Sequence, residues 1–183
     1  MSDPIALFAR PFYFLRHGET ESNARQLVAG SLDTELTPLG RQQALDAAQA
    51  LAGEPITAVY SSPLKRARDT AAPIAERLGL PVVIVPELAE RAWGVLEGQP
   101  RGSRVRGTTP QGAEPAEDFL QRILAGLAKI EGEVPLIVAH SGVFRVLCRA
   151  LCVEESDSPV TNCLPLRIVP AGPGAWKIEP ACG

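Results

Sequence analysis

The chain has 183 residues, of which 45% are hydrophobic and 21% are charged, and its formal net charge is −3. This length suits one well-buried core, so we expect a single domain over residues 1–183. The apolar share argues against disorder. The mild acidity argues against a general nucleic-acid-binding protein, which would carry a basic excess. An anionic substrate stays open, because a pocket can be basic on an acidic protein.

The beginning of the chain and its cysteines bear on cellular location. The first 18 residues are apolar but are interrupted by Pro4, Arg10 and Pro11, and Asp3 stands where a signal peptide would be basic. We therefore expect neither a signal peptide nor a membrane span.

The four cysteines form no C-x-x-C pair, which argues against structural zinc. We interpret Cys148 and Cys152 as small core residues and expect a cytoplasmic protein with free thiols.

Strands and helices are predicted to alternate along the chain. Residues 12–15 form a short apolar strand, and Thr37 caps a helix that Pro38 opens and Gly53 follows. The other expected elements are a strand at 56–60, a helix from Ser62 toward Leu78, a strand at 82–85, a loop at 98–113, a helix at 117–130, a strand at 136–139, a helix at 143–152, and strands at 164–169 and 175–179. Apolar strands between helices predict an α/β fold, a three-layer sandwich with a mainly parallel central sheet and helices on both faces.

Four polar stretches follow predicted strands, namely Arg16-His17, residues 61–66, Glu90 and His140. Sites in such sheets form beyond the carboxyl ends of strands, so the fold would bring these stretches to one edge. The two histidines are the only ones in the chain, and a histidine that ends an apolar strand is more often structural than functional. Gly18, however, lets the backbone turn tightly beside His17, and the helix that follows would offer free N–H groups to an anion.

Five stretches in order resemble one family. Residues 16–23 read RHGETESN, residues 61–71 read SSPLKRARDTA, residues 88–98 read LAERAWGVLEG and residues 139–143 read AHSGV. Residues 30–44, GSLDTELTPLGRQQA, are similar to the run that usually joins the first two. Over residues 12–146 the chain closely resembles the histidine phosphatase superfamily, also called phosphoglycerate mutase-like. RHG alone would be a weak signal, whereas all five stretches in the right order are specific.

The resemblance implies phosphoryl transfer without a metal or a cofactor, acting on a small phosphorylated substrate. His17 would attack phosphorus through its neutral imidazole and form a phosphohistidine. Arg16 and Arg66 would hold the phosphate oxygens, with His140 as a further donor. Glu90 would protonate the leaving alkoxide and then deprotonate water or a second hydroxyl. The substrate-binding residues expected from the same motifs are Thr20, Asn23, Gly30, Ser141, Gly142 and Arg101.

The family contains mutases, which return the phosphoryl group to the substrate, and phosphatases, which give it to water. Ala29, Trp93 and the run GVLEGQPR depart from the mutase pattern. The segment between Gly98 and the helix near Glu117 is also short, whereas mutases use longer covering segments to exclude water. We therefore favour a phosphatase acting on a small phosphate monoester, with a cofactor-dependent phosphoglycerate mutase-type phosphotransferase as the alternative.

Other hypotheses have less support. Arg101, Arg104 and Arg106 lie either in a solvated loop or in a lid that touches a second anionic group of the substrate, and Arg101 stands at the mutase lysine position. A metal hydrolase built from His17, His140 and nearby acids has little support, because the sequence has no H-x-H, H-E-x-x-H or clustered acidic motif. A non-catalytic phosphate-binding module would be expected to lack His17 or Glu90, and both are present. The identity of the ester and the oligomeric state stay open.

Overall fold

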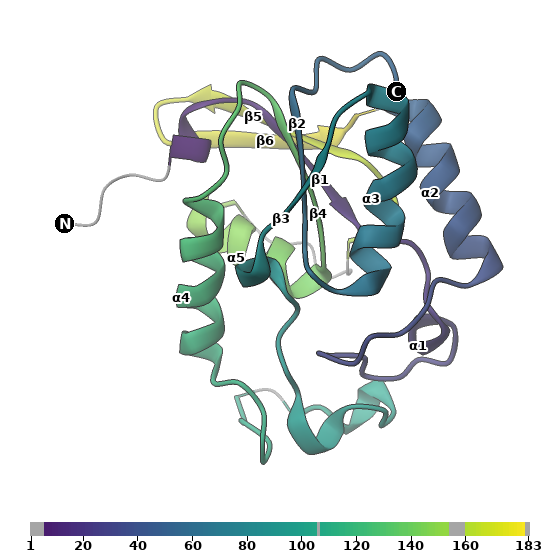
Figure 1. The fold of residues 1–183 in the computed structure, drawn as a ribbon. Helices are drawn as coiled ribbons and strands as arrows, with labels where there is room; N and C mark the ends of the chain where they lie inside the picture. The colour runs from purple at the N-terminus through teal and green to yellow at the C-terminus, as the bar shows by residue number, and fades with distance from the viewer. Residues whose placement is uncertain (1–5, 106, 154–159, 182–183) are drawn as a thin grey trace.

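The computed structural model describes residues 6–105, 107–153 and 160–181. Within these ranges six strands form one sheet in the order β3-β2-β4-β1-β5-β6 (Figure 1). Their bounds are β1 (Phe12–Arg16), β2 (Ala58–Ser61), β3 (Val82–Ile84), β4 (Pro135–Ala139), β5 (Leu166–Gly172) and β6 (Ala175–Pro180). Strands β1 to β4 run parallel to one another, while β5 is antiparallel to β1 and β6 to β5. The prediction of a mainly parallel sheet is confirmed.

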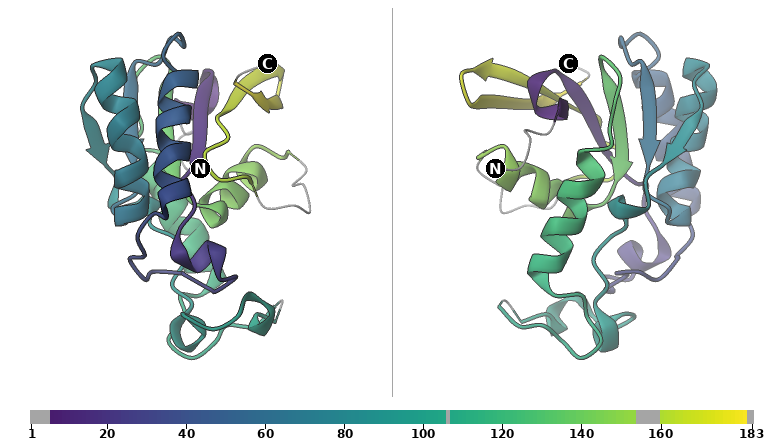
Figure 2. Two further views of the ribbon diagram at one scale, coloured as in Figure 1. Left: turned by 90° about the vertical axis from the view of Figure 1, so that its right-hand side faces the viewer. Right: turned by 60° about the vertical axis from the view of Figure 1, so that its left-hand side comes forward.

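Helices cover both faces of this sheet, as predicted. Helices α2 and α3 lie on one face, and α4 and α5 lie on the other (Figures 1 and 2). The helix bounds are α1 (Glu21–Ala24), α2 (Pro38–Ala50), α3 (Lys65–Leu78), α4 (Ala116–Leu127) and α5 (Ser141–Ala150). No helix in the described ranges is long and apolar enough to cross a membrane.

Strand β1 shows why the central strands are apolar throughout. Phe12 and Phe14 point into the core beneath α4 and α5, whereas Tyr13 and Leu15 point into the core beneath α2 and α3. Every residue of β1 and of β4 is buried, because helices cover both sides. Burial of each large apolar side chain contributes about 1.5–3 kcal/mol. The residues that follow these two strands therefore stand on the most firmly packed part of the fold.

The helix signals in the sequence were partly right. Thr37 caps α2 by accepting a hydrogen bond from Gly40 N at 2.9 Å, as predicted. Helix α3 begins at Lys65, however, and the prediction that it starts at Ser62 was wrong. Ser62 N instead donates to Val138 O at 3.1 Å, so the chain continues the sheet pairing beyond β2 before it turns into the helix.

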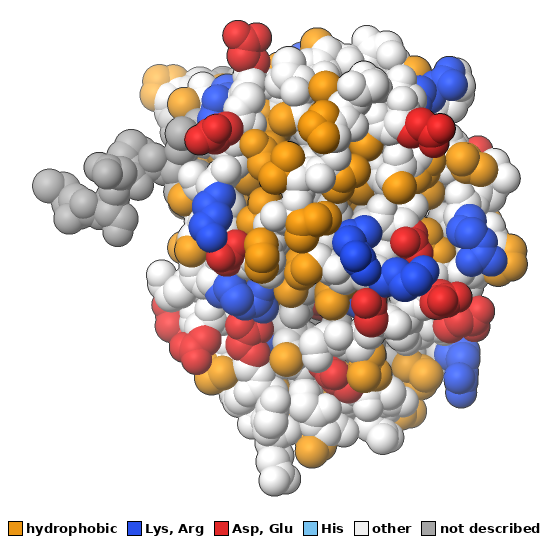
Figure 3. Space-filling model, in the orientation of Figure 1, with side chains coloured by type: hydrophobic (Ala, Val, Ile, Leu, Met, Phe, Trp, Pro, Cys, Tyr) orange, Lys and Arg blue, Asp and Glu red, His pale blue; other side chains and the backbone are white. Residues whose placement is uncertain are grey.

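The expectation that Cys148 and Cys152 are both core residues was half right. Cys148 is buried as predicted, but Cys152 is exposed, because α5 ends before it and its backbone takes a φ of +53°. The sheet is also less covered at its β3 edge, where Val83 is 44% and Ile84 is 41% exposed. Hydrophobic side chains gather on this face of the molecule (Figure 3).

Candidate active site

The register of β1 against β4 brings the two histidines together. Arg16 at the end of β1 lies opposite Ala139 at the end of β4, so His17 and His140 leave the sheet side by side. Their ring centroids are 5.2 Å apart. Strand β2 ends next to β4, and the Ser62 hydroxyl that follows it lies 2.7 Å from His140 Nε2. Three strands thus contribute to one cluster at the predicted edge.

His17 is held as a neutral imidazole. Its Nδ1 lies 2.8 Å from Gly18 O, and because a carbonyl oxygen only accepts, Nδ1 carries the proton and Nε2 keeps its lone pair. The side chain is only 5% exposed. Burial, together with the positive charges of Arg66 and Arg16, holds the pKa of His17 well below its ordinary value of 6.5. A neutral ring with a free Nε2 lone pair is the form that can act as a nucleophile.

The turn after His17 has no room for a side chain at Gly18. A Cβ atom there would come within 2.5 Å of Gly40 O. Gly18 N donates to the Thr70 hydroxyl at 3.0 Å, and that hydroxyl donates to Arg66 O at 2.7 Å. Thr70 therefore joins the turn that carries His17 to the helix that carries Arg66, a role the sequence did not suggest.

Two buried arginines lie beside His17. Arg66 is 1% exposed and donates to Gly30 O at 2.7 Å and to Leu32 O at 2.6 Å, while Arg16 donates to Val160 O at 2.8 Å. Burial lowers the pKa of Arg66 and lowers that of Arg16 to about 10, so both stay cationic at neutral pH. The Nε of each is buried and has no hydrogen-bond partner among the described residues, which leaves donors for an anion.

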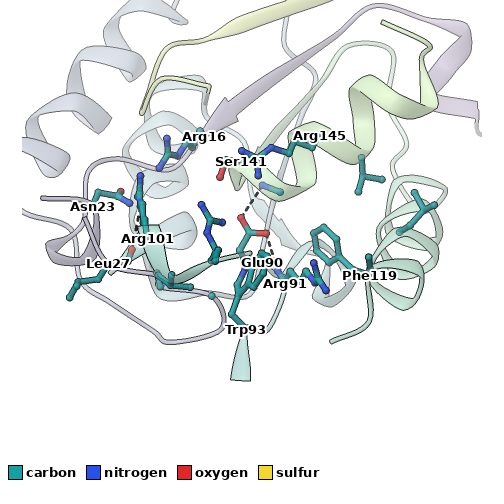
Figure 4. A pocket seen from close by; sticks show the side chains of 18 of the residues that line it. Arg16, Asn23, Leu27, Glu90, Arg91, Trp93, Arg101, Phe119, Ser141 and Arg145 are labelled. Atoms are coloured by element: carbon teal, nitrogen blue, oxygen red, sulfur yellow. Dashed lines mark hydrogen bonds between the residues drawn. The ribbon is translucent and has the colours of Figure 1, made fainter. Parts of the chain in front are cut away.

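The Glu90 carboxylate sits against the first turn of α5. Its Oε2 accepts from Gly142 N at 2.9 Å, and its Oε1 accepts from Arg91 N at 2.9 Å. A Cβ atom on Gly142 would come within 2.0 Å of Glu90 Oε1, so only glycine permits this approach. The side chain lies between the arginine-rich part of the pocket and the part lined by Phe119 (Figure 4).

These groups line one cavity of about 880 Å³. Of the charged side chains described along its wall, Glu90 is the one carboxylate, whereas the arginines are Arg16, Arg66, Arg91, Arg101, Arg104, Arg145 and Arg149. A basic cavity on a chain of net charge −3 favours an anionic ligand. In the ranges that the structure describes, no three His, Cys, Asp or Glu side chains are grouped to hold a metal ion.

The predicted site residues fall into two groups. The cavity is lined by Arg16, His17, Asn23, Gly30, Arg66, Glu90, Arg101, Ser141 and Gly142. Thr20 and His140 are fully buried and are not among the residues described as lining the cavity. Thr20 was expected to bind substrate, but its hydroxyl accepts from Asn23 N at 3.3 Å and its own N–H donates to Asn23 Oδ1 at 3.2 Å. Thr20 therefore caps α1, and its hydroxyl accepts from the Asn23 N–H group, one of those that we expected to be available to an anion.

Comparison with known proteins decides the family. Residues 12–165 match the family model of the histidine phosphatase superfamily, branch 1. The chain belongs to this family. The motif-based resemblance is thereby confirmed over a longer stretch than the motifs themselves cover.

The relatives of this chain carry the names of both phosphatases and mutases. A metal-independent phosphoserine phosphatase of Arabidopsis thaliana is 36% identical over 170 residues, which cover 81% of this chain and 71% of that protein. A probable phosphoglycerate mutase GpmB of Serratia proteamaculans is 39% identical over 146 residues, which cover 70% and 68%. The structure of a mycobacterial glucosyl-3-phosphoglycerate phosphatase with VO3 superposes with a TM-score of 0.78 at 28% identity, covering 95% of this chain and 100% of that chain.

Several residues of this site were not found from the sequence. Asn162 donates to His17 O at 2.6 Å and to Asn23 Oδ1 at 3.3 Å, and it comes from the stretch before β5, far from any motif. Arg145 and Arg149 line the cavity from α5. Their spacing of four residues on a helix that starts at the site is a signal that could have identified them.

A covering segment, described over residues 98–105 and 107–113, is attached to the loop after α1 through its backbone. Val28 N donates to Gln99 O at 2.8 Å, Gly98 N donates to Val28 O at 2.8 Å, and Arg101 N donates to Gln26 O at 2.9 Å. Two guanidinium groups contact the Trp93 ring, with Arg91 Cζ 4.5 Å and Arg104 Cζ 5.1 Å from its centroid. The segment therefore spans the cavity between the loop after α1 and the stretch that carries Glu90. Arg106 lies outside the described residues.

Proposed function

We propose that this chain is a metal-independent phosphatase that needs no cofactor and hydrolyses a small phosphate monoester through a phosphohistidine on His17. The observation that supports it most is the state of His17, whose Nδ1–H is engaged by Gly18 O while its ring is neutral and lines a cavity rich in arginine. A nucleophile poised in this way, surrounded by cations and with a carboxylate across the cavity, suits attack on a phosphate ester.

In the first step His17 Nε2 attacks phosphorus in line with the ester oxygen. The N–P bond forms as the P–O bond to the leaving group breaks, and Glu90 in its acid form gives its proton to the departing oxygen. Arg16 and Arg66 hold the phosphoryl oxygens, since a loose transition state needs positioning and charge stabilisation more than covalent help. The products of this step are an alcohol and phospho-His17.

His140 lies beside the nucleophile, with the two ring centroids 5.2 Å apart. The Ser62 hydroxyl accepts from Leu64 N at 3.3 Å, so its own hydrogen is available to donate to His140 Nε2. A neutral imidazole then carries its proton on Nδ1, which is buried and has no partner in the described part of the chain. This N–H is the further donor to the phosphoryl group.

In the second step water attacks the phosphorus of phospho-His17. Glu90, now a carboxylate, takes the proton from the water as the new O–P bond forms and the N–P bond breaks. Inorganic phosphate leaves and His17 returns to its neutral state. His17 and Glu90 line the same cavity of about 880 Å³, which offers room for the attacking water.

The alternative is transfer of the phosphoryl group back to an organic hydroxyl, as in the mutases of the family. It is supported by the 39% identity to a probable phosphoglycerate mutase. The chemistry up to phospho-His17 would be the same, so the two functions differ only in which hydroxyl attacks next.

A paired assay tests the proposal. Phosphate release from a panel of monoesters is measured in excess EDTA, beside an enolase-coupled assay for conversion of 3-phosphoglycerate to 2-phosphoglycerate with 2,3-bisphosphoglycerate supplied. We expect phosphate release that EDTA does not abolish and little or no mutase turnover. Loss of activity with EDTA that Mg²⁺ or Zn²⁺ restores would favour a metal hydrolase, and mutase turnover above phosphate release on every ester would favour the alternative.

A further inference from the structure

Glu97 lies outside the reacting groups, yet its carboxylate is fully engaged. Its Oε1 accepts from Ser31 N at 2.7 Å and from Trp93 N at 2.9 Å. The Ser31 hydroxyl lies 2.9 Å from Oε1 and 3.0 Å from Oε2. A glutamate in a loop is ordinarily a surface charge, but this one is half-buried and holds two separate segments. Because backbone N–H groups donate to this charged acceptor, the Glu97 carboxylate is held in a fixed position.

Ser31, which Glu97 holds, lies in the turn that supports Arg66. The residues on either side of it, Gly30 and Leu32, supply the two carbonyl oxygens that accept from the Arg66 guanidinium. The position of that guanidinium therefore depends on the position of the turn. Asp33 forms a second anchor by accepting from Lys65 N at 2.6 Å, but this bond reaches the start of α3 and not the stretch that carries Glu90.

Gly30 permits the carboxylate to approach the turn. Its φ is +55°, a left-handed conformation that L side chains rarely adopt. A Cβ atom there would come within 2.2 Å of Glu97 Oε1. Glu97 also acts on Arg66 through its charge, because burial lowers the pKa of Arg66 while the negative charges of Glu90, Asp33 and Glu97 oppose that lowering.

We propose that Glu97 is a positioning residue for phosphate binding. Through Ser31 it fixes the two carbonyl groups that direct the Arg66 guanidinium at the phosphate oxygens. This inference rests on the proposed function in one respect, that Arg66 binds the phosphoryl group. Its role differs from that of Glu90, since Glu97 transfers no proton and touches no reacting atom.

The test is direct binding of inorganic phosphate, followed by isothermal titration calorimetry. Glu97→Ala should raise the Kd for phosphate about tenfold, the usual effect of losing a charged hydrogen-bond partner that orders a binding group. Glu97→Gln should stay within about threefold of wild type, because its amide oxygen still accepts from both backbone N–H groups and its amide N–H can donate to Ser31 Oγ. Glu76→Ala, at an exposed position on α3, is the matched control and should bind phosphate as wild type does.

A double variant separates positioning from general stability. In the Arg66→Ala background, Glu97→Ala should cause no further loss of phosphate affinity, because the two residues act through one group. Additive losses, or an unchanged Kd in Glu97→Ala with only a lowered Tm, would overturn the proposal. If Glu97→Ala does not fold, Ser31→Ala removes the hydroxyl contact alone, and we expect about a threefold rise in Kd; an unchanged Kd there would overturn the proposal equally.

The binding readout is independent of turnover. A protein that binds phosphate as described but hydrolyses no monoester would contradict the proposed function. It would not contradict the positioning role of Glu97. In an active enzyme, Glu97→Ala should reduce kcat/KM by a similar factor on aryl and alkyl phosphates. The reason is that binding of the phosphoryl group by Arg66 does not depend on the leaving group.

Discussion

The sheet edge and the covering segment of the same cavity are built differently. His17, His140 and Arg66 follow buried parallel strands and are nearly inaccessible to solvent. In its described residues, 98–105 and 107–113, the covering segment has one short 3₁₀ turn, Arg101–Ser103, and its Val105 is 64% exposed. Groups held on packed strands keep precise geometry, whereas loops tolerate change. We therefore expect the chemistry to depend on the sheet edge and the choice among substrates to depend on the covering segment.

The strongest test of the contrast between the sheet edge and the covering segment is removal of the nucleophile. His17→Ala should reduce turnover on the order of 10³-fold or more, because no other group can form the covalent intermediate. Circular dichroism should show an intact fold, and acid-labile phosphate label should no longer be trapped. A variant that keeps a tenth of wild-type activity, or label trapped on another residue, would contradict the phosphohistidine mechanism.

Replacing the acid should have an effect that depends on the ester. Glu90→Gln should slow alkyl phosphates by about 10²- to 10⁴-fold, the usual contribution of general acid–base catalysis. Aryl phosphates such as p-nitrophenyl phosphate should lose far less, because an aryl oxide leaves without a proton. The measurement is kcat/KM on both kinds of ester with one preparation. Equal losses would mean that Glu90 holds structure or substrate and transfers no proton.

The burial of His140 should appear in the pH dependence of stability. Burial and nearby cationic charge hold the pKa of His140 in the folded state well below 6.5. Below that pH, His140 therefore binds a proton in the unfolded chain but not in the folded chain. The free energy of unfolding should therefore fall as pH falls, by up to about 1.4 kcal/mol per pH unit for this group. His140→Gln lacks this contribution, and urea unfolding between pH 7.5 and 5.5 should show a correspondingly shallower slope. Identical slopes would show that His140 is not held neutral.

The covering segment should give the smallest effect. Arg104→Gln removes one of the two guanidinium groups stacked on Trp93, an exposed contact worth about 0.5–1 kcal/mol. We expect KM to rise about two- to fivefold with little change in kcat, and Arg77→Gln, an exposed arginine on α3, serves as control. A fall in kcat beyond tenfold would place the covering segment within the reaction centre and remove the contrast between the two regions.

Much of the sheet edge could be predicted because it depends on local patterns. Apolar runs marked β1, β2 and β4, and the parallel arrangement that follows from alternating strands and helices puts their carboxyl ends together. His17, Arg66 and Glu90 were therefore found from their motifs and their places after strands. The start of α3 was missed because Ser62, a favourable cap by type, is used in sheet pairing with Val138, a partner 76 positions further along the chain.

The sequence by itself determined the family, the layer order and which residue types meet at the cavity, since motifs and hydrophobic periodicity are local properties of the chain. Only the tertiary structure decided the long-range partners of the polar groups. Asn162 reaches His17 O, and Glu97 holds the turn that supports Arg66. The physical reason is that buried polar atoms must find hydrogen-bond partners wherever loops distant in sequence bring them together. That choice depends on loop packing, which no local pattern encodes.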